Sequence, residues 1–107
     1  MDFDAIRKDM KLLSFETLRN DCDNFFEGVI FQQEIDKLKT QLGNLFGEPV
    51  FPSKNRMALN VQKTVDGFGG IMPGQVLYHK ASGAESVFAM LWPWKDGQHT
   101  TVKIIQQ

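Results

Sequence analysis

The sequence predicts an α+β fold in which three or four N-terminal helices pack on a C-terminal three-stranded antiparallel β-meander. Apolar residues recur every three to four positions through residues 1–46, as they do on one face of a helix. After the glycine-rich stretch 67–70, the spacing changes to every second residue, which is typical of strands. The 107 residues, 42% of them hydrophobic, suffice for one domain with its own core. We therefore expect a single α+β domain over residues 1–107, with a helical part at 1–46 and the meander at 75–105.

Two helical stretches are expected in the N-terminal part, the first over residues 3–13. Its apolar face carries Phe3, Ile6, Met10 and Leu13. The second stretch begins after Ser14, a suitable N-cap. Its apolar positions are Phe15, Leu18, Cys22, Phe25, Phe26 and Val29, followed by Phe31, Ile35, Leu38, Leu42 and Leu45. Gly43 or Gly47 is expected to end it. Because glycine weakens a helix interior by about 1 kcal/mol, residues 15–43 form either one helix or two helices that join near Gly28.

A further helix is predicted within residues 53–68. Pro49 and Pro52 favour an extended chain before it, and Ser53 is placed to cap its first turn. Its apolar side carries Met57, Ala58, Val61, Val65 and Phe68. The glycines that follow are expected to end the helix and reverse the chain.

Three strands are predicted after this helix, at residues 75–80, 86–94 and 98–105. The dipeptide Asp96-Gly97 is a typical two-residue hairpin turn between the second and third strands. Short connections favour an antiparallel meander with the second strand in the centre. The helices are then expected to cover one face of this sheet, giving two layers.

The hairpin register separates an aliphatic face from an aromatic face of the meander. Pairing Trp94 with His99 places Ala89 opposite Ile104 and Leu91 opposite Val102 on the aliphatic side. The aromatic side carries Phe88, Met90, Trp92 and Trp94, opposite Ile105, Lys103, Thr101 and His99. If Lys80 pairs with Ser86, Tyr78 joins the aromatic side and Leu77 the aliphatic side. A shift of one residue in that pairing would invert both.

The aromatic face is the candidate functional surface. Its predicted binding residues are Phe88, Met90, Trp92, Trp94, Tyr78, His99 and Lys103. An exposed row of large apolar side chains is unusual for a monomer, and aromatic residues and Met are enriched at protein interfaces. The sequence therefore favours a small non-enzymatic interaction module that binds a protein partner or a second copy of itself. The alternative is that the N-terminal helix or a loop covers this face and makes it a second core.

Two other functions are compatible with the sequence. One is a small-ligand site or enzyme in a groove between the loop Gly67–Gly74, His99 and the segment Trp92–Trp94, because glycine loops permit close approach of a ligand. The other is binding of single-stranded nucleic acid by aromatic stacking beside Lys103. The net charge of -1 weighs against the nucleic-acid interpretation.

No catalytic or metal-binding pattern is evident. His79 and His99 are expected at opposite ends of the sheet, so they cannot share a metal ion. Cys22 lies between Asp21 and Asp23, which disfavour a thiolate, and its place on the apolar stripe predicts a small core residue. We expect no cofactor and no metal. The chain lacks an apolar run of membrane-spanning length and a signal-peptide pattern, so we expect a cytoplasmic protein that does not enter a membrane.

Overall fold

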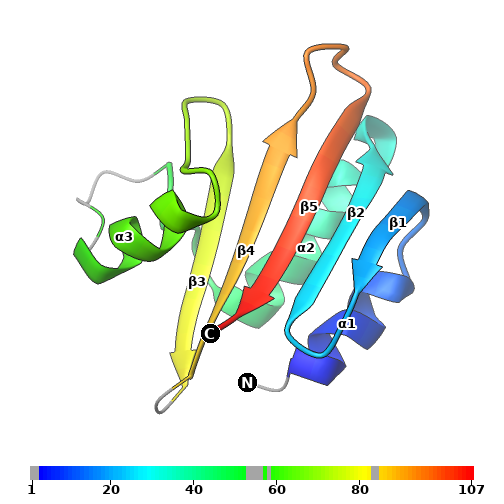
Figure 1. Ribbon diagram of the computed structural model, residues 1–107. Coiled ribbons are helices and arrows are strands. Elements are labelled where there is room, and N and C mark those ends of the chain that lie inside the picture. The colour runs from blue at the N-terminus through cyan, green and yellow to red at the C-terminus, as the bar shows by residue number, and fades with distance from the viewer. Residues whose placement is uncertain (1–2, 53–56, 58, 83–84) are drawn as a thin grey trace.

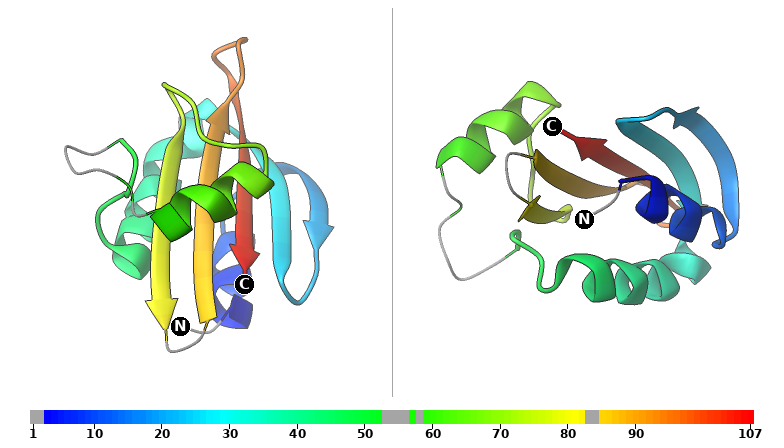
Figure 2. Two further views of the ribbon diagram at one scale, coloured as in Figure 1. Left: turned by 60° about the vertical axis from the view of Figure 1, so that its left-hand side comes forward. Right: turned by 90° about the horizontal axis from the view of Figure 1, so that it is seen from below.

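The computed structural model describes residues 3–52, 57, 59–82 and 85–107 and contains one five-stranded antiparallel sheet with helices on both faces (Figures 1 and 2). In chain order the elements are α1 (Phe3–Lys11), β1 (Phe15–Asp21), β2 (Phe25–Phe31), a 3-10 turn (Gln32–Glu34), α2 (Ile35–Phe46), α3 (Leu59–Gly67), β3 (Val76–Ser82), β4 (Glu85–Pro93) and β5 (His99–Gln106). The strand order across the sheet is β1-β2-β5-β4-β3.

The α+β class and the antiparallel sheet are confirmed, but the predicted three-stranded meander with N-terminal helices is wrong. The segment expected to be helical from residue 15 onward forms the hairpin β1–β2, which adds two strands to the sheet. Strand β2 pairs with β5 along its whole length, from Phe25 opposite Ile105 to Phe31 opposite His99. Aromatic and β-branched residues crowd β2 and favour a strand. The spacing of a short apolar run fits either structure, so pairing with β5 decides between them.

The helices α1 and α2 lie where the apolar spacing predicts them. In α1 the buried residues are Phe3, Ile6 and Met10, and in α2 they are Ile35, Leu38, Leu42 and Phe46. Gly47 ends α2 with φ of 82°, and its N–H donates to the carbonyl of Gly43 at 2.9 Å. A residue with a side chain would be strained at this φ, which explains why glycine stands there.

The sheet carries a separate apolar core on each face, and this corrects the expected two-layer arrangement. Helices α1 and α2 cover one face, whereas α3 lies across the β3–β4 half of the other (right-hand view of Figure 2). The core under α3 consists of Val61, Val65, Leu77, Phe88, Met90 and Ile105. Phe68, Ile71 and Trp92 pack against it from its rim. Several residues of the predicted aromatic face are therefore buried in a second core beneath α3.

The predicted register is confirmed for β4 and β5 and wrong for β3. Phe88 lies opposite Ile105 and Trp92 opposite Thr101, as predicted. The predicted two-residue turn is wrong, because the hydrogen-bonded turn runs from Trp94 to Gly97, with Lys95 and Asp96 at its centre. Lys80, however, pairs with Val87 instead of Ser86, which turns Tyr78 to the α1–α2 face. Leu77 then lies under α3. A one-residue shift inverts a whole strand because side chains alternate between faces.

Two further expectations concern single residues. Cys22 is exposed between β1 and β2, so the expected buried position is wrong. The prediction assumed that Cys22 lies on the apolar face of a helix, but this segment forms a hairpin. The predicted N-cap Ser53 lies outside the described residues.

Candidate functional site

Helix α3 leaves half of its sheet face without a covering helix in the described part of the chain (Figures 1 and 2). This half is formed by β1, β2 and β5 together with the end of β4. Side chains that project here form what we call the open sheet surface: Arg19, Glu27, Phe31, Trp94, His99 and Lys103. These residues come from three strands and from the turn after β4, so the surface exists only once the sheet is assembled.

Three rings form a row at one end of the open sheet surface. The His99 ring lies between Trp94 and Phe31, with centroid separations of 4.8 and 5.1 Å. Trp94 and Phe31 are each 39% exposed. The indole Nε1 of Trp94 donates a hydrogen bond of 2.8 Å to Oγ1 of Thr101, which holds the ring over β5. The row therefore presents large apolar side chains in a fixed orientation.

Two carboxylates hold the imidazole of His99. Its Nδ1 lies 2.5 Å from Oδ2 of Asp96, and its Nε2 lies 2.7 Å from Oε2 of Glu16. The hydrogen bond with Asp96, aided by the negative charge of Glu16, raises the pKa of His99 above its ordinary value. Since both ring nitrogens contact a carboxylate, neither is open to a metal ion. The two contacts fix the orientation of the imidazole within the ring row.

The rest of the open sheet surface carries charges of both signs. Arg19 forms an ion pair of 3.2 Å with Glu27 and also lies 5.8 Å from the Trp94 ring centroid. The Nζ of Lys103 lies 3.8 Å from the ring centroid of Trp92, within the range of cation–π attraction. These cations cover part of the apolar surface while they keep their charged ends near solvent.

The structure divides the seven sequence-predicted site residues between three environments. Phe88 and Met90 are buried beneath α3. Trp92 is half-buried at the edge of that core, and Tyr78 is buried on the opposite face of the sheet. The other three predicted residues all belong to the open sheet surface.

The glycine loop that the sequence suggested as a ligand groove packs against an aromatic ring. A Cβ on Gly69, whose φ is 108°, would lie 3.2 Å from Cη2 of Trp92. The close backbone approach expected of this loop is therefore made to Trp92. Gly74 lines a pocket of about 120 Å³ on the α2 side, together with Ile35 and Lys39.

Sequence reasoning missed the contributions of β1 and β2 to this surface. It places Arg19, Glu27 and Phe31 on a helix, where they do not share a face with Trp94. The alternation of Glu27, Val29 and Phe31 could have identified them, because these residues face the same side of β2. That inference requires the hairpin β1–β2 to be recognised first.

We expect the two histidines to titrate on opposite sides of the ordinary histidine pKa of about 6.5. Burial lowers the pKa of His79, whereas Asp96 and Glu16 raise that of His99. The raised pKa means that His99 stabilises the fold fully below about pH 6.5 and loses this contribution as the pH rises through its folded pKa. Proton NMR titration of both imidazole rings measures which of the two pKa values is higher.

The variant Glu16→Gln supplies the control for this titration. It should lower the pKa of His99 and leave that of His79 unchanged, because Glu16 contacts only His99 of the two. A His99 pKa below that of His79 in the wild-type protein would contradict the ion-pair geometry.

Comparison of the chain with family models, curated proteins and solved structures finds no match. Among the described residues, no cluster of three or more His, Cys, Asp or Glu side chains is arranged to hold a metal ion. The helices of the described part are too short or too polar to cross a membrane.

Proposed function

We propose that the protein is a small interaction module that associates with a second copy of itself through the open sheet surface. The observation that carries this proposal is the ring row, in which Trp94 and Phe31 remain 39% exposed on either side of His99. Tryptophan and arginine are the residue types most often found at the energetic centres of interfaces. Both lie here on a sheet face that α3 leaves uncovered.

The charge distribution favours a second copy as the partner. The open sheet surface carries the cations Arg19 and Lys103 and the anion Glu27, and the anion Glu16 contacts His99. A two-fold axis brings the same patch of two subunits together, so a patch that carries both signs can match its own charges. A surface of one sign would repel its copy. Electrostatic complementarity of this kind also fixes the orientation of the partner.

Sedimentation velocity over a concentration series tests the proposal. The wild-type protein should shift from monomer to dimer as its concentration rises. Trp94→Ala and Phe31→Ala should each raise the dissociation constant by about 10-fold or more, since truncation of a central aromatic residue costs roughly 2 kcal/mol of binding energy. Tryptophan emission should shift to shorter wavelength on association as Trp94 loses contact with water.

Leu12→Ala is the matched control. Leu12 is 81% exposed at the end of α1, on the other side of the sheet, so its removal should leave the dissociation constant unchanged. A wild-type protein that stays monomeric at every concentration would overturn the proposal. So would an equal weakening by Leu12→Ala and Trp94→Ala.

A further inference from the structure

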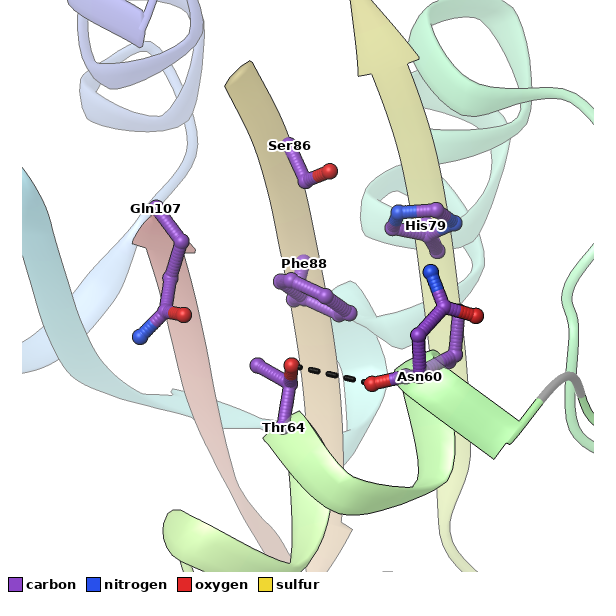
Figure 3. Close-up of a pocket in the computed structure, with 7 residues that line it drawn as sticks. Asn60, Thr64, His79, Ser86, Phe88 and Gln107 are labelled. Atoms are coloured by element: carbon purple, nitrogen blue, oxygen red, sulfur yellow. Dashed lines mark hydrogen bonds between the residues drawn. The ribbon is translucent and has the colours of Figure 1, made fainter. Parts of the chain in front are cut away.

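A cavity of about 290 Å³ lies between α3 and the strands β3 and β4 (Figure 3). It is separate from the open sheet surface. The residues that line it are Asn60, Val61, Thr64, His79, Ser86, Phe88 and Gln107. Figure 3 shows the polar side chains arranged around the ring of Phe88. We call this cavity the α3 pocket.

The polar groups of the α3 pocket retain hydrogen-bonding capacity. Within the described residues, the side chains of Asn60, Ser86 and Gln107 form no hydrogen bond, so their donors and acceptors are available to a ligand. The hydroxyl of Thr64 donates to the carbonyl of Asn60 at 3.0 Å and can still accept a bond. Burial lowers the pKa of His79, so its imidazole is neutral near pH 7 and offers one donor and one acceptor.

The walls of the pocket are held in place by the fold. The backbones of Ser86 and Gln107 exchange two hydrogen bonds of 2.8 Å each. Val61 and Val65 fix α3 in the second core. The His79 ring packs on Phe88 with a centroid separation of 4.6 Å and an interplanar angle of 30°. The backbone and the His79–Phe88 pair that frame the pocket are therefore in place before a ligand binds, which reduces the ordering cost of binding.

The lining selects the chemical class of the ligand. The side chains of Asn60, His79, Ser86 and Gln107 can both donate and accept hydrogen bonds, as sugar hydroxyls do, and Thr64 can accept one. None of the lining side chains is an acid, lysine or arginine. Phe88 is only 3% exposed and one side of its ring is taken by His79, so it offers no free platform for a nucleobase. The volume of about 290 Å³ falls at the lower limit of ligand pockets, which suits a molecule smaller than a typical drug.

We propose that the α3 pocket binds an uncharged polyhydroxylated ligand of monosaccharide size. This site lies on the other half of the sheet face from the ring row and does not depend on self-association. Its ligand would form hydrogen bonds with Asn60, Ser86 and Gln107.

Amide NMR titration with glucose, galactose, mannose, ribose and ribitol tests the proposal, with uridine, adenosine and glucose 6-phosphate for comparison. At least one neutral polyol should shift the amide signals of His79, Ser86 and Gln107 along a saturable curve, with a dissociation constant of about 1 mM. Asn60→Ala and Ser86→Ala should each weaken binding by about 3- to 10-fold, as expected for the loss of one or two hydrogen bonds.

Asn44→Ala is the matched control, because Asn44 is an exposed asparagine within a helix on the opposite face of the sheet. It should leave the affinity unchanged. The proposal is overturned if no polyol gives a saturable shift with the folded wild-type protein. It is also overturned if glucose 6-phosphate or a nucleoside binds more tightly than every polyol, or if Asn44→Ala weakens binding as much as Asn60→Ala.

Discussion

Replacing Phe88 by alanine is expected to lower the free energy of unfolding by about 3–5 kcal/mol. Phe88 is 3% exposed and lies between the sheet and α3, in contact with the core that contains Val61 and Met90. Removing the ring leaves a cavity that α3 cannot fill without shifting, so the lost burial and the cavity both count against the folded state. Urea denaturation followed by circular dichroism measures the change.

The same substitution at Phe31 is the matched control. Phe31 projects from the same sheet face but is 39% exposed, because no helix of the described part lies over this face of β2 (Figures 1 and 2). We expect Phe31→Ala to cost roughly 1 kcal/mol, the typical value for a residue outside the core. Equal losses at the two positions would show that α3 does not cover the β3–β4 half as described.

Replacing Gly28 by alanine is expected to destabilise the protein by about 1–3 kcal/mol, through overpacking. A Cβ at this position in β2 would lie 2.7 Å from Cδ2 of Phe15 and 3.1 Å from the carbonyl oxygen of Thr17. The Phe15 ring would have to move, and this would disturb its edge-on contact with Phe26, in which the ring centroids lie 5.5 Å apart. Thermal unfolding of the two proteins measures the change.

The sign of the stability change at Gly28 distinguishes the observed strand from the helix that the sequence predicted. In a helix interior, the same substitution would stabilise by about 1 kcal/mol. Gly43→Ala shows the contrast within one chain. Gly43 lies inside α2, and a Cβ there would meet no atom within 4 Å apart from its own helix backbone and chain neighbours. Alanine at this position should therefore stabilise by about 0.5–1 kcal/mol. Stabilisation at both positions would contradict the hairpin β1–β2.

Only part of the candidate site could be predicted from the sequence. Trp94, His99 and Lys103 share a face because of the β4–β5 register, which the sequence predicts from the short, glycine-containing turn between these strands. Their exposure does not follow from it. Phe88 and Met90 lie on the same face of β4 as Trp92 and yet are covered, because α3 packs over one half of the sheet and not over the other.

The sequence by itself determined the elements that depend on neighbouring residues. The C-terminal end of helix α2 is set by its apolar spacing and by Gly47, and the β4–β5 register by the short turn that contains Asp96 and Gly97. The tertiary structure alone decided that residues 25–31 pair with β5, that Tyr78 and Leu77 exchange faces, and that α3 lies opposite α1 and α2. The physical reason is that short apolar runs fit both a helix and a strand. Contacts between residues far apart in the chain then select the structure that buries both faces of β4.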